Sequence, residues 1–178
     1  HFKYQRYLKR YLRTIESIDE SVGRVLDFLG ENGLAENTIV IYTSDHGFSL
    51  GHNGIWGHGM ATWPATTHRP SFNIPLVVCG EPVERQEKVC DAMVSQIDLF
   101  PTLLSFAGIE AKPSLSSVAR DISPYLRGQT QHWSDAVFME QEETRAVRTK
   151  DWLYMKRFDG APSHLLEDAL FDLNRDPQ

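Results

Sequence analysis

The sequence has no long hydrophobic run. No segment approaches the roughly 18 to 20 consecutive apolar residues that a membrane-spanning helix needs. It also lacks a run of lysine and arginine, and its 24 acidic against 18 basic residues give a formal net charge of -6. We therefore expect no membrane span and no nucleic-acid partner. An anionic small molecule is not excluded, because a bound divalent cation would be the largest local charge in such a site.

Cysteine is scarce as well. Cys79 and Cys90 are too few for a disulfide framework, although one bridge between them stays open in an oxidising compartment. Because Cys79 lies within an apolar run, we expect it to be a buried structural thiol. The sequence begins at His1, with neither an initiator methionine nor a signal peptide. We therefore expect a chain that starts partway through a longer protein, and its localisation stays unknown.

Hydrophobic periodicity predicts a helix that leads into a strand. Between residues 11 and 29 the apolar side chains recur every three or four positions, as one face of an amphipathic helix requires, and Gly30 supplies a stop. Residues 38–43 form a continuous β-branched and aromatic run, which is typical of a strand covered on both faces. A helix followed by a buried strand favours a mostly parallel α/β sheet.

Further elements follow along the chain. Residues 74–79 predict a second buried strand, residues 94–97 a short strand or extended piece, and residues 98–104 a short helix with Asp98 near its cap and Pro101 in its first turn. Between the two strands, residues 47–73 show no sustained period. A segment of that length predicts a functional loop, and its aromatic residues argue against disorder.

The last third of the sequence has a different pattern. Around residues 111–117 the chain turns polar and loses its periodicity, which predicts a domain boundary. Beyond it, short runs of strand-forming residues at 135–140, 144–149 and 152–157 are separated by brief connections. Such spacing favours a small antiparallel sheet.

Candidate metal ligands follow the first predicted strand. Ligands of α/β sheets gather beyond the carboxyl ends of strands, where this sequence has Asp45 and His46. One carboxylate and one imidazole suit Ca²⁺ with added oxygens, Mn²⁺ or Zn²⁺. Two ligands hold a metal weakly, so we expect the others from outside this chain, from water or from substrate. The structural alternative is that Asp45 caps the following turn and His46 is merely packed.

Three histidines, His46, His52 and His58, follow the strand at intervals of six residues. No helix brings that spacing to one face, so a shared site would have to be built by folding of the loop. The glycines between them make such folding sterically easy.

These residues and their surroundings resemble the C-terminal signature of sulfatases. The resemblance rests on the strand ending in Asp45-His46-Gly47, on Leu50-Gly51 and on Trp56-Gly57-His58-Gly59. It extends in order along the chain through residues 18–26, 74–78, 94–109, 145–149 and 170–177. It implies an α/β fold in which residues 1–112 are the C-terminal portion of a catalytic domain, with a mixed sheet flanked by helices. Residues 113–178 would then be a small C-terminal α+β subdomain with an antiparallel sheet.

The resemblance also implies site roles. In the family, the residues that match Asp45 and His46 bind a divalent cation, usually Ca²⁺, with Mg²⁺ or Mn²⁺ as other candidates. The position of His58 is commonly a lysine that contacts the sulfate. As a histidine it keeps a donor whose charge depends on pH. A cationic His58 could stabilise negative charge or protonate the leaving oxygen. The alternative is a loop histidine bonded to backbone.

Other residues are weaker candidates, because here the loop departs from the common family pattern. Five side chains could line a substrate pocket: His52, Trp56, Trp63, His68 and Arg69. For His132 and His164, which fall in the expected C-terminal subdomain, a surface position is the simpler interpretation. Asp19 on the first helix reads as a structural partner.

The family nucleophile is a formylglycine made from Cys or Ser in a C/S-x-P-x-R motif. Neither Cys79 nor Cys90 is followed by Pro and Arg at the required offsets. The resemblance therefore implies that the formylglycine and two further metal ligands lie upstream of this chain. We expect the parent protein to hydrolyse a sulfated small molecule or sulfated saccharide, and this chain to be inactive without the remainder of the catalytic domain.

Two alternatives stay open. The same scaffold serves phosphonate and phosphate ester hydrolases, and a fold does not fix a substrate. A sulfatase-derived module could also act by binding alone, without any catalysis.

Overall fold

The computed structural model describes residues 2–58, 65–81, 83, 89–110, 118–129, 135–158 and 167–176. The helices are α1 (Phe2–Glu31), α2 (Arg69–Phe72), α3 (Leu99–Phe106) and α4 (Ser123–Leu126), with 3-10 turns η1 (Ala35–Asn37), η2 (His52–Gly54) and η4 (Gln96–Asp98). The strands are β1 (Val40–Thr43), β2 (Ser49–Leu50), β3 (Trp56–Gly57), β4 (Leu76–Cys79), β5 (Ala136–Gln141), β6 (Thr144–Thr149), β7 (Trp152–Arg157) and β8 (Ala169–Asp172).

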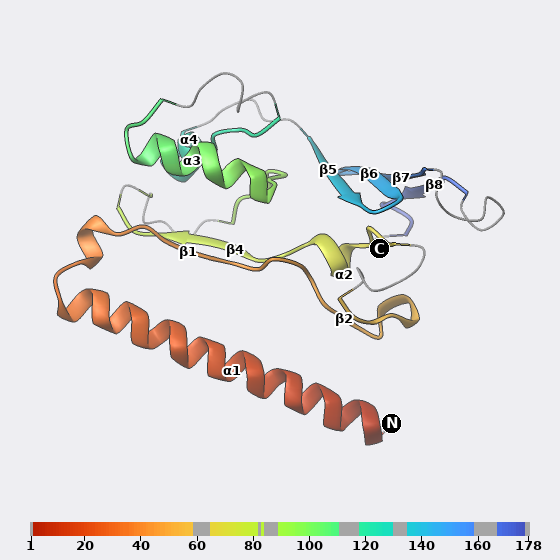
Figure 1. Ribbon diagram of the computed structural model, residues 1–178, viewed down its shortest axis with the longest axis horizontal. Helices are drawn as coiled ribbons and strands as arrows, with labels where there is room; N and C mark the ends of the chain where they lie inside the picture. The colour runs from red at the N-terminus through yellow and green to blue at the C-terminus, as the bar shows by residue number, and fades with distance from the viewer. Residues whose placement is uncertain are drawn as a thin grey trace.

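The strands form three separate sheets. β1 pairs with β4, β2 pairs with β3, and the C-terminal strands lie in the order β5-β6-β7-β8. In Figure 1 the β1–β4 ribbon lies between α1 on one side and α3 with α4 on the other, and the β5–β8 sheet lies beyond one end of the ribbon. The arrangement confirms the predicted α/β class and the predicted antiparallel sheet in the C-terminal part. None of the described helices has both the length and the apolar character that a membrane span requires.

Helix α1 is confirmed and is longer than the apolar pattern indicated. The predicted stop at Gly30 is wrong, because Gly30 stays within the helix and the left-handed residue is Gly33, with φ of 65°. The Leu34 N–H donates to the Leu29 carbonyl at 2.9 Å, and the Gly33 N–H donates to the Gly30 carbonyl at 3.2 Å. This pair of hydrogen bonds is the Schellman ending of a helix, which needs the glycine after the last turn.

The expected mostly parallel sheet is wrong for the described residues. β1 and β4 are antiparallel, in a register that runs from Val40 opposite Cys79 to Thr43 opposite Leu76. Parallel neighbours need a long crossover, usually a helix that packs on the sheet. The connection here instead contains the β2–β3 hairpin and the single turn of α2. Residues 47–73, predicted as a loop without a sustained period, therefore contain short regular elements among their described residues.

The strand β4 is not covered on both faces among the described residues. Its burial alternates, so Leu76 and Val78 are half-buried while Val77 and Cys79 are exposed. The prediction of a buried Cys79 thiol is therefore wrong, since Cys79 shares the exposed face of Val77. Both cysteines are free, and no disulfide joins them.

A capping box begins the predicted short helix. Ser95 has extended backbone, as expected for residues 94–97, but the chain then turns into η4 and continues as α3. The Asp98 side chain accepts the Ser95 backbone N–H at 2.8 Å, and the Ser95 side chain caps the Asp98 backbone in return. Asp98 thus acts near the start of the helix as predicted, from the third position of its turn.

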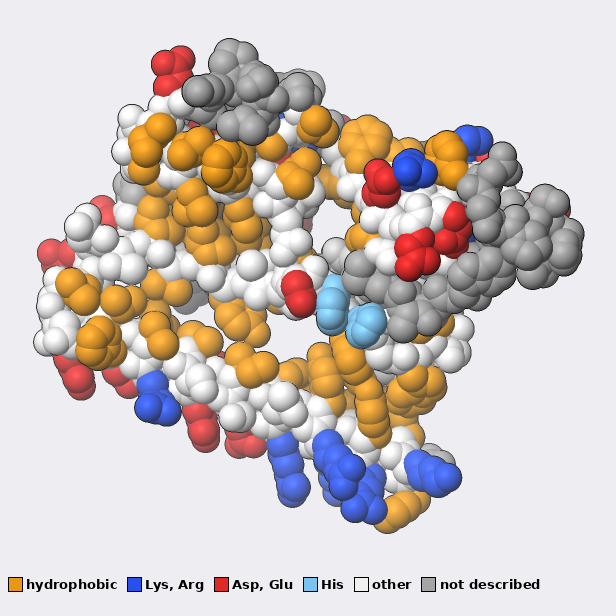
Figure 2. Space-filling view, in the orientation of Figure 1, with side chains coloured by type: hydrophobic (Ala, Val, Ile, Leu, Met, Phe, Trp, Pro, Cys, Tyr) orange, Lys and Arg blue, Asp and Glu red, His pale blue; other side chains and the backbone are white. Residues whose placement is uncertain are grey.

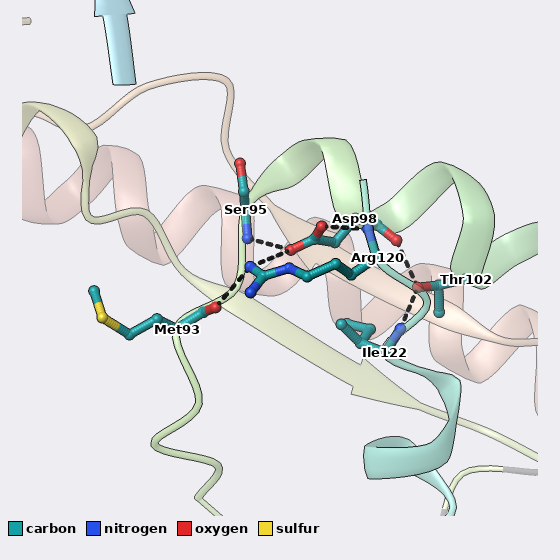
Figure 3. Close-up of polar contacts among 6 residues, drawn as sticks. All are labelled: Met93, Ser95, Asp98, Thr102, Arg120 and Ile122. Atoms are coloured by element: carbon teal, nitrogen blue, oxygen red, sulfur yellow. Dashed lines mark hydrogen bonds and ion pairs between the residues drawn. The ribbon is translucent and has the colours of Figure 1, made fainter. Parts of the chain in front are cut away.

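The Asp98 carboxylate also holds a distant segment (Figure 3). It is fully buried, and its Oδ1 accepts the Arg120 backbone N–H at 2.7 Å. The Arg120 guanidinium lies 3.2 Å from Oδ2 and also donates to the Met93 carbonyl at 3.0 Å. Each oxygen of this buried carboxylate therefore has a donor, which offsets the cost of its desolvation.

A second link of the same network passes through Thr102 (Figure 3). Its hydroxyl donates to the Asp98 carbonyl at 2.6 Å and accepts the Ile122 N–H at 3.0 Å. Thr102 and Ile122 are both buried. The first turns of α3 are thereby fixed against the chain that enters α4.

The C-terminal sheet carries the main hydrophobic core. The buried members of that core are Ala146, Leu153, Met155 and Leu173. The predicted strands at 135–140, 144–149 and 152–157 are confirmed as β5, β6 and β7, while β8 was not predicted as a strand. The predicted domain boundary falls in residues 111–117, which lie outside the described residues, so the division at residue 112 stays a prediction.

We expect Asp98→Ala to lower the free energy of unfolding by about 3–5 kcal/mol, because it leaves the Arg120 guanidinium without its buried partner. Urea denaturation of the full-length protein that contains this chain measures the effect. The exposed carboxylate Asp91 provides the control, and Asp91→Ala should change the free energy of unfolding by less than about 0.5 kcal/mol. Equal effects of the two variants would contradict a structural role for the Asp98 network.

Candidate active site

The loop after β1 is held by two side-chain hydrogen bonds. The Gln96 amide donates to the Ser44 carbonyl at 2.6 Å, and the Ser44 hydroxyl donates to the His46 carbonyl at 2.8 Å. Gln96 comes from η4, so the turn that contains the buried Asp98 also supports the end of β1. Sequence reasoning missed Gln96, because no local pattern signals a contact between residues 52 positions apart.

Asp45 and His46 lie side by side at the end of β1, as predicted. The Asp45 Oδ1 lies 3.8 Å from the His46 Nε2, and the Asp45 side chain is 84% exposed. The His46 backbone N–H donates to the same Oδ1 at 2.9 Å. This hydrogen bond, followed by the charge of His46, lowers the pKa of Asp45. The carboxylate is therefore ionised at neutral pH and accessible to a ligand.

The orientation of the His46 ring suits a metal ligand. Its Nδ1 lies 3.0 Å from the Gly47 carbonyl, and since a carbonyl can only accept, Nδ1 carries the proton. The lone pair of a neutral ring is then on Nε2, on the side of the Asp45 carboxylate. A hydrogen bond from one ring nitrogen to a carbonyl is the usual way to orient a histidine whose other nitrogen binds a metal.

The donor set fits half of a cation site. Two ligands about 2.1–2.5 Å from one cation lie roughly 3–4 Å apart, which accommodates the 3.8 Å between Asp45 and His46. Within the described ranges, no group of three or more His, Cys, Asp and Glu side chains could hold a metal ion. Asp45 and His46 therefore offer two donors, which is fewer than a cation site needs.

The β2–β3 hairpin brings His58 close to His46 and places His52 away from them. Because Ser49 lies opposite Gly57, the hairpin brings its two ends together and places His58 near His46. The two rings have centroids 4.8 Å apart, tilted by 38°, and His58 is exposed. Figure 2 shows histidine side chains beside an acidic one on this face. His52 lies in the η2 turn at the tip of the hairpin, where its Nδ1 accepts the Leu50 N–H at 3.2 Å.

Aromatic contacts dock the hairpin onto α1. The Trp56 ring packs edge-on against Tyr4 and Tyr7, with centroids 5.8 and 5.4 Å apart. Phe48 stacks on Tyr11 at 5.4 Å. Such pairs stabilise by about 0.5–1.5 kcal/mol beyond the area that they bury. Trp56, a candidate for the substrate pocket, thus has a structural contact, while Trp63 lies outside the described residues.

A backbone contact ties the loop to α2. The Gly47 N–H donates to the Ser71 carbonyl at 2.8 Å. A Cβ on Gly47 would lie 2.0 Å from the Pro70 carbonyl oxygen, so no other residue fits there without a backbone shift. This close approach sets the position of the residue after His46.

The segment around α2 also packs against the C-terminal sheet. The Ala65 N–H donates to the Glu143 carboxylate at 2.8 Å, and the Ala65 carbonyl accepts the hydroxyl of Thr144 and the guanidinium of Arg157. The His68 ring packs edge-on against Phe171 at 5.6 Å. The candidate site and the C-terminal sheet are therefore joined by one stretch of chain.

The two remaining pocket candidates lie in this stretch. His68 is half-buried, and burial followed by the charge of Arg157 lowers its pKa, so its ring is neutral at neutral pH. Arg69 is exposed at the start of α2. Neither contacts Asp45 or His46 among the contacts of the described residues. His132 and His164, expected at the surface, lie outside the described residues.

A family model and curated relatives match the chain. The model described as Sulfatase covers residues 1–109. The N-acetylglucosamine-6-O-sulfatase of Bacteroides thetaiotaomicron is 26% identical over 99% of this chain and 32% of its own length. The arylsulfatase K of Bos taurus is 30% identical over 94% of this chain and 31% of its own length. The chain thus spans about a third of the length of these relatives.

Solved structures agree with the sequence matches. A structure in complex with its substrate D-glucosamine-2-N,6-O-disulfate superposes with a TM-score of 0.85 and 26% identity. That match covers 99% of this chain and 36% of the other. A 2-O GAG sulfatase superposes with a TM-score of 0.73 and 25% identity, covering 90% of this chain. These matches confirm the fold that the sequence resemblance implied.

We expect Gly47→Ala to weaken divalent-cation binding by roughly ten- to hundredfold, because the added Cβ displaces the carbonyl that orients the His46 ring. Calorimetric titration of the full-length protein with CaCl₂ measures the affinity. Gly23→Ala in α1 is the control, since its Cβ meets no atom within 4 Å. A Gly47→Ala protein with wild-type affinity would show that this loop tolerates displacement.

Proposed function

Because this chain belongs to the sulfatase family, we propose that it supplies Asp45 and His46 as metal ligands to an enzyme that hydrolyses sulfate esters. The observation that carries the proposal is the pair itself, with the Asp45 carboxylate 3.8 Å from the His46 Nε2 at the end of β1. The lowered pKa of Asp45 and the hydrogen bond that orients His46 both favour cation binding. The cation proposed is Ca²⁺, with Mg²⁺ or Mn²⁺ as substitutes.

The proposed chemistry divides between the cation and the side chains. A bound divalent cation supplies positive charge to the sulfate oxygens. His58, beside His46 and exposed, is proposed to contact the sulfate and to donate a proton to the oxygen that leaves with the alcohol. The sulfur–oxygen ester bond breaks in this reaction, giving sulfate and an alcohol. The sequence has no C/S-x-P-x-R motif, so the proposal takes the nucleophile and further metal ligands from elsewhere in the protein.

Exposed apolar surface supports a partner within the same domain. α1 has no buried residue, and a cavity of about 350 Å³ lies between it and β1, lined by residues that include Val22, Leu26 and Ile41. Figure 2 shows apolar side chains over α1 and over the α3 region on this face. We propose that the remainder of the catalytic domain packs against these surfaces.

The proposed substrate is a sulfated saccharide. Two observations support this class: one relative is an N-acetylglucosamine-6-O-sulfatase, and one superposed structure holds a disulfated glucosamine as its substrate. The surroundings of the metal pair are compatible with a polar ligand, since Asp45 and His58 are both exposed.

In the full-length protein, we expect Asp45→Ala to lower Ca²⁺ affinity at least about a hundredfold and to abolish metal-dependent sulfatase activity, since it removes a charged ligand. Activity against an aryl sulfate and calorimetric titration with CaCl₂ measure the two effects. Asp19→Ala, an exposed carboxylate on α1, is the matched control and should leave both unchanged. Wild-type turnover in Asp45→Ala would remove Asp45 from the site.

For the 178-residue chain produced by itself, we expect no turnover of aryl sulfates even with added CaCl₂, because it has no nucleophile motif and two metal ligands hold a cation weakly. A colorimetric assay at high protein concentration, with a metal-free blank and the full-length protein as positive control, measures this. Turnover above the blank would show that this chain contains a nucleophile of its own.

A further inference from the structure

A second group of polar side chains lies where the α2 segment covers the C-terminal sheet. In the register of that sheet, Arg148 on β6 lies opposite Leu153 on β7, which lies opposite Phe171 on β8. Directly opposite residues share one face of a sheet. Since His68 packs on Phe171 and Leu153 is fully buried, Arg148 is on the face that the α2 segment covers.

Arg148 lies in a setting that is costly for a cation. Burial, followed by the nearby charge of Arg69, lowers its pKa. Its Nη1 is buried without a hydrogen-bond partner, and none of the ion pairs among the described residues includes Arg148. A half-buried guanidinium beside a second arginine is stabilised when an anion joins them.

The covering segment adds further polar groups without partners. Within the described residues, the buried side-chain atoms that lack a hydrogen bond include the hydroxyls of Thr67 and Ser71 and the Nδ1 of His68. Thr67 is 1% exposed and Ser71 is 3% exposed. Buried polar groups in folded proteins are nearly always paired with protein, water or ligand, so unpaired ones on three neighbouring residues mark a place where a bound ligand or water would be stabilised. Two guanidinium groups with hydroxyl donors suit an oxyanion.

We propose that Arg69 and Arg148, with the donors of the α2 segment, bind an oxyanionic group of the substrate, either sulfate or carboxylate. The location supports this, because Ser71 in α2 accepts the Gly47 N–H and so links this anion site to the Asp45–His46 loop. A substrate with two anionic groups would place one at the metal pair and the other between the arginines. The assignment of the oxyanion to the substrate rests on the proposed function. The ability of the two arginines to bind an oxyanion does not.

The other charged side chains near Arg69 and Arg148 do not prevent an anion from binding there. Arg157 is engaged by the Ala65 carbonyl and the Thr144 hydroxyl, so it supports the segment and does not reach toward a ligand. The Glu143 carboxylate accepts the Ala65 N–H. Asp176 acts electrostatically on His68, but more weakly than Arg157 does. Arg69 is exposed and Arg148 is only half-buried, so part of each side chain is accessible to solutes.

The direct test measures stabilisation by inorganic sulfate. In the full-length protein carrying Asp45→Asn, which removes the metal pair from the comparison, sodium sulfate should raise the melting temperature above that in NaCl of equal ionic strength. Arg69→Met combined with Arg148→Met should abolish the sulfate-specific rise. Arg145→Met, on the opposite face of the same strand, should keep it.

The source of the anion is tested by competition and kinetics. If the site binds a substrate group, Arg148→Met should raise KM roughly ten- to hundredfold for a saccharide that carries a second sulfate or a carboxylate. For a monosulfated analogue, KM and kcat should stay at wild-type values. Comparing sulfate with acetate in the melting experiment separates a sulfate subsite from a carboxylate subsite, and either preference supports an oxyanion site.

Two outcomes overturn the proposal. One is an equal sulfate-specific rise in the double arginine variant and in Arg145→Met. The other combines two results: sulfate does not raise the melting temperature of the protein that keeps both arginines, and Arg148→Met lowers the melting temperature in sulfate-free buffer. A carboxylate of the protein itself would then occupy the position between the arginines. Loss of sulfatase activity in Asp45→Asn alone bears only on the proposed function.

Discussion

The arrangement of the candidate site depends on one close backbone contact, between Gly47 and α2. The Gly47 N–H reaches the Ser71 carbonyl at 2.8 Å, and the absence of a side chain on Gly47 is what permits the approach. On one side, Gly47 follows His46 and its carbonyl orients the His46 ring. On the other side, α2 continues from the segment that Thr144 and Glu143 bind. The Asp45–His46 pair and the C-terminal sheet are thus connected through a single glycine.

Buried polar groups provide the second support of the site. The Asp98 carboxylate fixes η4 and the start of α3, and Gln96 in the same turn donates to the Ser44 carbonyl, one residue before Asp45. Hydrogen bonds of this kind add modest net stability, but leaving one of their groups unpaired in the interior is costly. The main effect of the network is therefore to fix the position of the end of β1, and with it the position of Asp45, rather than to add net stability.

Local patterns in the sequence predicted the structural features that are determined by residues close together in the chain. The period of α1, the strand-forming runs of β1 and β4, and the adjacency of Asp45 and His46 can all be read from a short window. The direction of β4 could not, because pairing depends on how the intervening chain folds, and here it forms a hairpin rather than a crossover helix. The prediction that Cys79 is buried was wrong for a related reason, since an apolar run does not reveal which face of the strand is covered. Arg148 was missed because only the pairing of β6, β7 and β8 brings it under the α2 segment.

The adjacency of Asp45 and His46 has a consequence for how the site is assembled. Consecutive residues share one backbone turn, which is fixed by the Ser44 hydroxyl and the His46 N–H in the folded chain. The conformational entropy of ordering both donors is therefore lost when the protein folds and not when a cation arrives. In the proposed cation site the pair would act as a preorganised chelate, because a cation held by the exposed carboxylate would have the imidazole within reach at no further cost in backbone freedom.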